Sequence, residues 1–419
     1  MADKRLKIGY LMQAEAVPMS DFSGPRSHVC AVFEGLKARG HQVRMVAIQN
    51  GNTFWTDDVV DWAPARFSFT RSFFFRIIES PLRRIQSAFT LPFFRFFDSV
   101  KFADACISAL AGYDVLYERF GMMSSGGLLA SKWLGIPIIL EVNGDLVEEY
   151  KQQKLAISRT QWWAINVVTK WMFCRADRIV AVGETIKRRI LGRWRFDSSK
   201  VSVIPNGADV ELFASSRPNP VVCSRYMLDS RPFVIFVGSF QPWHGVDLLL
   251  KAFQKVSAVC GKAQLALVGD GALRPATERT ATELGLDGHV VFTGVLKHEE
   301  LGPLLASAEV AVICHRAEAA EIVESPLKLF EYMAAGKAIV APAVPNMRRI
   351  LTDRVNALLV PPDDVDALAQ ALIELLESRE LRASLGKTAQ TDALARHSWA
   401  QTVSEVENLM LDAVTRRAG

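Results

Sequence analysis

The sequence predicts an α/β protein made of two units, each with a parallel β-sheet covered by helices. The chain has 419 residues, which is enough for two domains. Apolar segments of strand length alternate with helix-like segments through both halves, and this alternation is typical of parallel sheets. Between the halves, segment 214–232 is rich in proline, serine and charge, so we interpret it as a linker.

The first half opens with a buried strand at 6–12, a loop that contains Gly24, a helix from about 27 to 39 and a strand at 41–49. This order predicts a Rossmann-like unit in which ligands bind at the carboxyl ends of the strands. Gly24 is either a turn glycine or a contact for a phosphate. Further elements of this unit are expected at 113–120 (strand), 124–135 (helix), 136–145 (strand), 175–183 (strand) and 201–213 (strand and turn).

Segment 66–101 interleaves phenylalanine with arginine, and two proline-containing breaks divide it into two or three short helices. Two interpretations stay open. The phenylalanines are core and the arginines a solvated face, or the segment lies in a membrane interface and is attracted to anionic lipid. A second unusual segment, from Gln161 to Cys174, has three tryptophans. It predicts a buried or interfacial helix that does not span a bilayer.

Composition restricts the class of function. The net charge of +4 is mild and does not indicate a nucleic-acid partner. The six cysteines are scattered without a Cys-x-x-Cys pair, and no acidic pair is placed as metal ligands, so we expect no metal site. The short charged start is no secretory signal, and the expected location is cytoplasmic.

The second half repeats the alternation, with strands expected at 232–240, 264–271, 289–296 and 309–316 and helices at 246–256, 273–284 and 299–307. Helices at 364–377 and 397–417 end the chain. A further helix is expected to begin with Ser325 as N-cap and Pro326 at its first position, and to end before Gly336.

Lys328 and Glu331 lie three residues apart on this helix and are therefore neighbours. Because Pro326 has no N–H, the free donors at the helix start are the amides of Leu327 and Lys328, and such a start attracts a phosphate. A carboxylate one turn later accepts two hydrogen bonds from a ribose diol. The alternative is an ordinary surface ion pair, which stabilises a protein little.

The string SPLKLFEYMAAGKAIVAP (residues 325–342) resembles the nucleotide-sugar helix of the retaining glycosyltransferases of family 4, which are also called glycosyl transferases group 1. The string VSVIPNGADVELF (201–213) is similar to the signature of that family at the exit of its first domain. The resemblance implies the GT-B fold, which has two facing Rossmann-like domains with parallel sheets and an interdomain cleft. It implies an acceptor-side domain of residues 1–213 plus the crossover helix 397–419, and a nucleotide-sugar-binding domain of residues 232–396.

The resemblance also implies roles for particular residues. Glu331 holds the ribose, Leu327 and Lys328 bind the phosphates, and the loop with Gly24 approaches the donor. Val295 and Leu296, at the end of a strand, bind the base through their backbone. The arginine and lysine that the family places on the diphosphate are replaced by Ser239 and His244, so Lys328 is the main cation expected, with Arg316 and a protonated His244 as second choices.

On the acceptor side the resemblance places Asn143 in a turn where relatives carry a polar group near the transferred sugar, and Arg119 where they carry a basic residue. Asp145 is a further acceptor-side candidate, although we expect it and Glu118 to be solvated loop acids. The second acid of the family falls at Val323, so that Glu324 reaches the donor sugar only after a shift of one residue.

The resemblance therefore implies a metal-independent retaining transfer of a sugar from a UDP- or GDP-sugar to a hydroxyl of a glycan, a lipid-linked compound or a small molecule. No cofactor is expected besides this co-substrate, and 66–101 would place the protein peripherally on the inner face of a membrane. The alternatives are a sugar-nucleotide epimerase or a phosphorylase of the same fold, or a non-catalytic nucleotide-sugar-binding protein, because fold alone does not choose among them.

Overall fold

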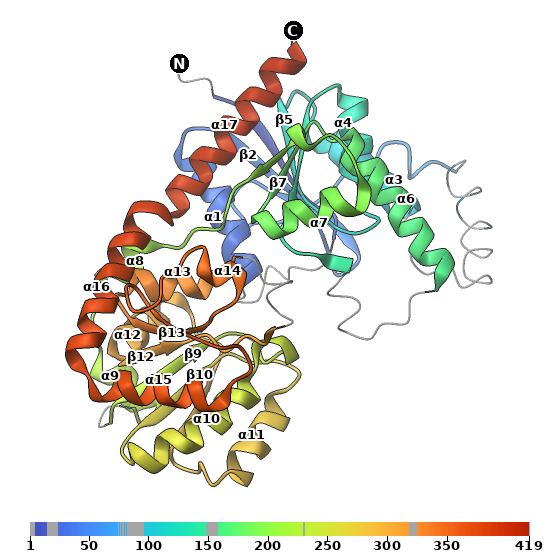
Figure 1. The fold of residues 1–419 in the computed structure, drawn as a ribbon. Helices are drawn as coiled ribbons and strands as arrows, with labels where there is room; N and C mark the ends of the chain where they lie inside the picture. Colours follow the sequence, from blue (N-terminus) through green and yellow to red (C-terminus); the bar gives the residue numbers. More distant parts are fainter. Residues whose placement is uncertain are drawn as a thin grey trace. The chain divides into compact units, whose positions relative to one another are not determined.

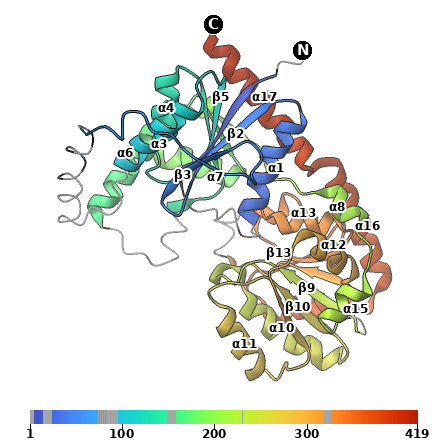
Figure 2. The same ribbon diagram turned by 180° about the vertical axis from the view of Figure 1, so that it is seen from behind.

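The computed structural model divides the chain into two compact units, which are drawn in Figures 1 and 2. Unit 1 comprises Met1–Pro205 together with Thr402–Gly419, and unit 2 comprises Asn206–Gln401. The domain limits expected from the sequence stay a prediction. The residues that the structure describes are 5–14, 24–73, 75, 77, 79, 81, 96–147, 158–228, 231–317 and 325–418.

Unit 1 is built on an eight-stranded sheet with the order β4-β3-β2-β1-β5-β6-β7-β8. Six of its strands run parallel, as the sequence predicts, and they are β1 (Lys7–Met12), β2 (Gln42–Gln49), β5 (Val115–Arg119), β6 (Ile138–Val142), β7 (Arg178–Ala181) and β8 (Val201–Val203).

The other two strands of unit 1, β3 (Asn52–Thr56) and β4 (Ala63–Pro64), were not predicted. At the edge of the sheet β3 pairs antiparallel with β2, and β4 pairs antiparallel with β3. The turn between β2 and β3 consists of Asn50 and Gly51, both with positive φ (48° and 73°). An Asn-Gly pair between two strands is a strong signal for a hairpin, and it was present in the sequence.

Helices cover both faces of this sheet (Figures 1 and 2). Four of them share one hydrophobic core on one face, namely α3 (Phe96–Ala109), α4 (Gly126–Leu134), α6 (Arg159–Arg175) and α7 (Glu184–Trp194). On the other face α1 (Gly24–Ala38) packs with the C-terminal α17 (Trp399–Ala418). They approach closely at Gly35, where an added Cβ would lie 2.6 Å from Val403.

Two expectations for unit 1 need correction. Gly24 is the first residue of α1, so the helix begins about three residues earlier than predicted and Gly24 is not in a loop. Much of segment 66–101 lies outside the described residues, so its division into short helices is not settled. Of its described phenylalanines, Phe97 is buried, Phe67 and Phe75 are half-buried, and Phe69 and Phe73 are 40% and 73% exposed. Phe69 and Phe73 are therefore not core residues.

Unit 2 is built on a six-stranded, all-parallel sheet with the order β11-β10-β9-β12-β13-β14. Its strands are β9 (Phe233–Val237), β10 (Gln264–Val268), β11 (Val290–Gly294), β12 (Val310–Val312), β13 (Ala338–Pro342) and β14 (Leu358–Val360). The parallel sheet predicted from the alternation is confirmed, although the short β14 was not foreseen.

The helices of unit 2 are α8 (Val210–Ser215), α9 (Pro220–Arg225), α10 (Val246–Val259), α11 (Arg274–Glu283), α12 (His298–Ser307), α13 (Leu327–Ala334), α14 (Pro345–Arg348), α15 (Val365–Glu377) and α16 (Arg379–Arg396). Segment 214–232 is more than a linker, because α9 lies within it and buries Val222 and Cys223 in the core. Asn219 caps α9 by accepting from two backbone amides, so this composition encodes a short helix.

Candidate functional site

The strand order of unit 2 reverses between β9 and β12. The chain proceeds from β9 to β10 and β11 on one side, and β12, β13 and β14 follow on the other. Ligands of open parallel sheets bind outside the carboxyl ends of the strands at such a switch point. Gly238 directly follows β9, and His315 lies three residues after the end of β12. This point is therefore the first place to look for a site.

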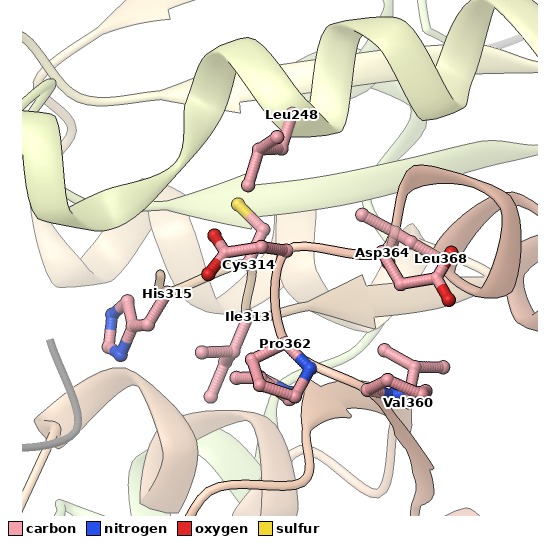
Figure 3. Close-up of a pocket in the computed structure, with 11 residues that line it drawn as sticks. Leu248, Ile313, Cys314, His315, Val360, Pro362, Asp364 and Leu368 are labelled. Atoms are coloured by element: carbon pink, nitrogen blue, oxygen red, sulfur yellow. The ribbon is translucent and has the colours of Figure 1, made fainter. Parts of the chain in front are cut away.

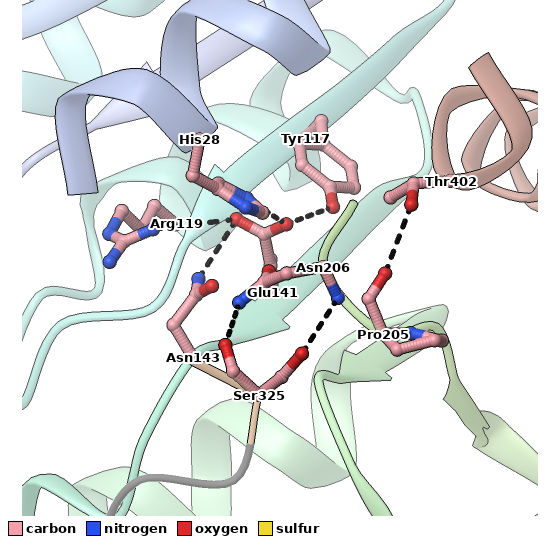
Figure 4. A network of polar contacts seen from close by, with 9 residues as sticks. All are labelled: His28, Tyr117, Arg119, Glu141, Asn143, Pro205, Asn206, Ser325 and Thr402. Atoms are coloured by element: carbon pink, nitrogen blue, oxygen red, sulfur yellow. Dashed lines mark hydrogen bonds and ion pairs between the residues drawn. The ribbon is translucent and has the colours of Figure 1, made fainter. Parts of the chain in front are cut away.

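Helix α13 begins at the same region, but its start differs from the prediction. The first helical residue is Leu327, Pro326 precedes it with extended backbone, and no side chain caps the helix. The Ser325 hydroxyl instead accepts a hydrogen bond of 3.2 Å from the Asn206 amide, and the Asn206 side chain donates to the Ser325 carbonyl at 2.9 Å (Figure 4). Ser325 thus joins the segment before α13 to Asn206, which follows β8, and it is not an N-cap.

Asn206 and Gly207 have the structural role that the sequence predicts. A Cβ on Gly207 would lie 2.6 Å from the backbone nitrogen of Trp399, so only glycine lets the two chain segments pass this closely.

The body of α13 is buried all round, from Lys328 to Ala334. Phe330 stacks on His397 with ring centroids 4.4 Å apart, and the Tyr332 hydroxyl accepts a 2.7 Å hydrogen bond from the Val237 amide at the end of β9. The helix ends at Ala334, before Gly336 as predicted, and Gly336 has a φ of 65°. These contacts fix α13 against the end of β9.

Lys328 and Glu331 are only 9% and 8% exposed, so the interpretation as a surface ion pair is wrong. The Lys328 ammonium lies 4.5 Å from the centre of the Phe236 ring, a favourable cation–π distance. It has no hydrogen-bond partner among the described residues. Burial lowers the pKa of Lys328 to about 8, although Cys314 and Glu331 act in the opposite direction.

Gly238 makes room for this ammonium. An added Cβ would lie 2.7 Å from Lys328 Nζ, and the φ of 153° is one that other residues rarely adopt. A buried ammonium without a partner is unfavourable unless an anion completes it. Lys328 Nζ, beside the backbone of Gly238, is therefore a candidate position for an anionic group.

The Glu331 carboxyl group lies one turn further along α13. Burial raises its pKa to about 7, and the charge of Lys328 opposes that rise. His298, at the start of α12, approaches it to 3.8 Å. The exposed Val295 and the buried Leu296 directly follow β11. A ligand between the end of β11 and α13 could donate a hydroxyl to Glu331 and contact the backbone of Val295 and Leu296.

The two histidines beside Lys328 are neutral. Burial and the charge of Lys328 lower the pKa of His244 to about 3, against the opposing contact with Ser239. Burial, Lys328 and His244 also hold the pKa of His315 well below its usual range. Their rings stack with centroids 5.0 Å apart and an interplanar angle of 16°.

The expectation of a protonated His244 is therefore wrong. Its Nδ1 contacts the carbonyl oxygen of Ser239, which can only accept, so Nδ1 carries the proton and Nε2 is an acceptor. His244 in this tautomer can receive a hydrogen bond from a hydroxyl but cannot donate one from Nε2 to a phosphate.

Arg316, the other alternative cation, is already paired. Its guanidinium donates to Asp247 at 2.5 Å and lies 3.8 Å from Asp363. The exposed Ser239 follows β9 as predicted. Lys328 therefore remains the cation best placed for an anion at this switch point, while Glu324 lies outside the described residues.

A pocket opens beside His315 at the carboxyl ends of β12, β13 and β14 (Figure 3). The lining residues are Leu248, Ile313, Cys314, His315, Pro342, Val360, Pro361, Pro362, Asp363, Asp364 and Leu368. Asp363 accepts a hydrogen bond of 3.1 Å from the Ala317 amide, which holds the chain at the rim.

Unit 1 has its own buried polar cluster at the carboxyl ends of β5 and β6, centred on Glu141 (Figure 4). Glu141 accepts from Tyr117 at 2.7 Å and from Asn143 at 3.0 Å, and it lies 2.8 Å from His28 and 3.9 Å from Arg119. Burial would raise the pKa of Glu141, but its contacts with His28 and the charge of Arg119 lower it to about 2. The cluster holds the Asn143 side chain by a hydrogen bond, and Arg119 faces Glu141 at ion-pair distance.

Glu118 and Asp145 are not solvated loop acids, contrary to the prediction. Glu118 is fully buried, and burial raises its pKa to about 8 against a hydrogen bond with the Gly127 backbone. Asp145 is 7% exposed and pairs with Arg189 at 3.1 Å and Arg193 at 3.3 Å. Its place in these ion pairs is structural.

Several functional candidates were missed from the sequence. Gly238, Phe236 and His315 surround Lys328, and His28 supports Glu141, yet none carries a motif of its own. Gly238 and His315 each follow a strand that flanks the switch point. A strand order predicted from the sequence would have indicated both residues.

The fold consists of two α/β units with parallel-rich sheets, and the second unit has a candidate anion-binding position at its switch point. Residues 22–212 match the family described as Glycosyltransferase Family 4, and residues 231–378 match Glycosyl transferases group 1. The chain belongs to glycosyltransferase family 4, also called glycosyl transferases group 1, as the resemblance of its motifs predicted.

A curated relative is the phosphatidyl-myo-inositol mannosyltransferase of Mycolicibacterium smegmatis, which is 31% identical over 229 residues. The match covers 54% of this chain and 56% of the relative, so the chain spans about half the length of that protein.

Two solved structures share the fold over nearly the whole chain. A glycosyltransferase from Rickettsia africae ESF-5 has a TM-score of 0.71 at 15% identity and covers 98% of this chain and 99% of its own. Anabaena Alr3699/HepE in complex with UDP-glucose has a TM-score of 0.70 at 17% identity, with 97% and 100% covered. The GT-B fold expected from the sequence is confirmed.

Proposed function

We propose that the chain transfers a sugar from a UDP- or GDP-sugar, bound by unit 2, to a hydroxyl of an acceptor. The observation that carries the proposal is the buried Lys328 ammonium, which has no hydrogen-bond partner among the described residues and lies beside Gly238 with the Glu331 carboxyl one turn away. A nucleotide diphosphate has complementary groups, since its phosphates are anionic and its ribose carries two hydroxyl donors. The relationship to Alr3699/HepE, which binds UDP-glucose, supports this choice of donor.

In this proposal the diphosphate lies against Lys328 Nζ and the amides of Leu327 and Lys328 at the start of α13. Negative charge builds on the diphosphate as the sugar departs, and a preformed positive group in a buried site stabilises this charge more than it stabilises the ground state. A buried ammonium can supply this stabilisation without a metal ion. The loss of the two family cations to Ser239 and His244 makes Lys328 the main contributor.

The ribose would donate two hydrogen bonds to Glu331, with the base against the backbone of Val295 and Leu296. The neutral His244 would accept a hydrogen bond through Nε2 from a hydroxyl of the donor sugar. We propose this in place of a phosphate contact, because the proton of His244 lies on Nδ1. Gly24, at the start of α1, and Glu324 stay predicted donor contacts.

Unit 1 would supply the acceptor side through Asn143, which donates a hydrogen bond to Glu141, and Arg119, which lies 3.9 Å from Glu141. Asp145 would act only indirectly, through the arginines it pairs with. Retention of anomeric configuration follows from the resemblance, with the acceptor hydroxyl attacking from the face that the diphosphate leaves.

The acceptor would be a glycan, a lipid-linked compound or a small molecule, and the protein would act in the cytoplasm with peripheral contact to the membrane through 66–101. The exposed Phe69 and Phe73, near the exposed Arg66 and Arg71, support this part of the proposal. Among the described residues no helix has both the length and the apolar character needed to cross a membrane.

The test is donor binding by the Glu331→Ala variant, measured by calorimetry after a thermal-shift panel of nucleotide sugars has identified the donor. Two hydrogen bonds to a charged group contribute about 1.5–3 kcal/mol each, so we expect affinity to fall by at least about 100-fold. Glu283→Ala, which removes an exposed carboxylate from α11, is the matched control.

Near-normal affinity of Glu331→Ala for UDP and GDP would contradict the ribose assignment. Donor binding by the unaltered protein with no transfer to a wide panel of acceptors would favour a non-catalytic nucleotide-sugar-binding protein.

A further inference from the structure

Helix α6 has an apolar stripe on its outer side. Trp163, Val167 and Trp171 are 69%, 47% and 39% exposed. They occur at intervals of four residues, which places them next to one another along one side of a helix. Large apolar side chains in a contiguous exposed stripe mark an interaction surface more often than singly scattered ones do.

The fold does not need this stripe. The opposite side of α6 already packs into the core of unit 1 through Ile165, Met172 and Phe173. At its start Ser158 and Gln161 form a reciprocal capping box, which satisfies the backbone without help from the outer face. Trp163 therefore contributes little to folding, Trp171 is covered in part, and the exposed side of the stripe is available to a partner.

The charged residues of helix α6 itself all have one sign. Helix α6 contains Arg159, Lys170 and Arg175 and no acidic residue. Arg159 and Lys170 are exposed, and at about 100° per residue Lys170 lies just beside the Trp163 edge of the stripe.

The neighbouring helix in the same layer, α7, adds further positive charge. Its sequence ETIKRRILGRW has four basic residues and one acidic residue, Glu184. Arg189 and Arg193 pair with Asp145, so the further charge comes from Lys187 and Arg188. The chain as a whole has 49 basic and 45 acidic residues, so this concentration of positive charge is local.

We propose that the outer face of α6 lies in the interface of an anionic lipid bilayer, with its tryptophans among the headgroups and its basic residues, together with Lys187 and Arg188 of α7, against the lipid phosphates. A helix with tryptophan on its outer face and basic residues around it has the chemistry of an interfacial helix. A second copy of this face would bring like charges together, and charge therefore favours lipid over self-association. This surface is separate from segment 66–101 and does not depend on the proposed sugar transfer.

The experiment measures binding of the full chain to vesicles of phosphatidylcholine with and without phosphatidylglycerol, by co-sedimentation and by quenching of tryptophan fluorescence with brominated lipid. The unaltered protein should bind the anionic vesicles, be quenched by them, and dissociate as salt is raised. The double variant Trp163→Ser/Trp171→Ser should lose most of both signals.

Two further variants complete the design. Val259→Ser/Leu394→Ser removes two exposed apolar side chains of unit 2, 62% and 48% exposed, and should bind as the unaltered protein does. Arg159→Glu/Lys170→Glu should weaken partition into anionic vesicles by more than about tenfold, since each basic residue near an anionic surface contributes about fivefold.

The proposal is overturned if the unaltered protein ignores anionic vesicles, if phosphatidylglycerol makes no difference, or if the tryptophan variant binds as well as the unaltered protein. A dimer in solution that the tryptophan variant dissociates, with no vesicle binding, would assign the face to a second copy and equally overturn it. Circular dichroism establishes folding of each variant. If the tryptophan variant does not fold, the charge variant decides by the same measurements.

Discussion

The affinity for a nucleotide sugar should pass through a maximum near pH 7.5. Burial raises the pKa of Glu331 to about 7, so this carboxyl group is neutral below that pH and charged above it. Burial lowers the pKa of Lys328 to about 8, so the ammonium is charged below that pH and neutral above it. The proposed contacts need both charges, because the ribose hydroxyls donate to a carboxylate and the diphosphate binds an ammonium.

The size of the effect follows from these two values. At pH 7.5 about 60% of the protein carries both charges, and at pH 5.5 about 3% does, so the apparent affinity should fall about 20-fold between them. A similar fall is expected from pH 7.5 to pH 9.5. The two groups are neighbours, so the two limbs report the pair and not each group alone.

The assay is calorimetric titration with a nucleotide sugar, because its diphosphate is esterified at both ends and stays singly charged per phosphate over this pH range. Glu331→Gln should remove the acid limb and keep the alkaline one. Lys328→Met should keep the acid limb and remove the alkaline one. An affinity that does not change from pH 5.5 to 9.5 in the unaltered protein would refute the charge assignment.

Two further substitutions test other parts of the structure. Gly238→Ala places a Cβ 2.7 Å from Lys328 Nζ and should weaken donor binding at least about tenfold by displacing the ammonium; Gly288→Ala, also at positive φ but with no atom within 4 Å, is the control, and equal affinity in both variants would contradict the candidate anion-binding position. Glu118→Gln should raise the free energy of unfolding by up to about 3 kcal/mol at pH 7 and not at pH 4. The reason is that the pKa of Glu118 is about 8 when folded and 4.5 when unfolded, so unfolding releases a proton and stability falls as pH rises between these values. Urea denaturation at both pH values measures this, and parallel pH profiles for variant and unaltered protein would show that the carboxyl group is not buried as described.

Much of the fold could be predicted because strand-length apolar segments and helical periodicity are local signals. The parallel sheet of unit 2 and the helix that carries Lys328 and Glu331 were expected on that basis. The Asn50-Gly51 hairpin was equally local and was missed because its turn signal was not used. Helix α9 was mistaken for a linker, since its capping residue Asn219 lies in a segment whose composition resembles one.

The character of the site could not be predicted, because burial depends on contacts between distant segments. The three-residue spacing of Lys328 and Glu331 is the same on a surface and in a core. Only the packing of α13 shows that the two groups are buried, with shifted pKa values, and are not a weak surface ion pair. His244 was expected as a cation, but burial and the charge of Lys328, which is far from it in sequence, lower its pKa to about 3 and make it neutral.

Helix α6 shows the same limit. Its three tryptophans were compatible with a buried or an interfacial helix, and its sequence alone did not separate them. In the structure the helix has one buried face, with Met172 in the core, and one exposed face, with Trp163.

The most direct test of the whole account is a crystal structure of the protein with a nucleotide sugar or nucleoside diphosphate bound. The account predicts ribose hydroxyls within hydrogen-bonding distance of the Glu331 carboxylate and a phosphate oxygen on Lys328 Nζ beside Gly238. A nucleotide bound away from the start of α13, with the Lys328 ammonium still without an anion, would contradict it.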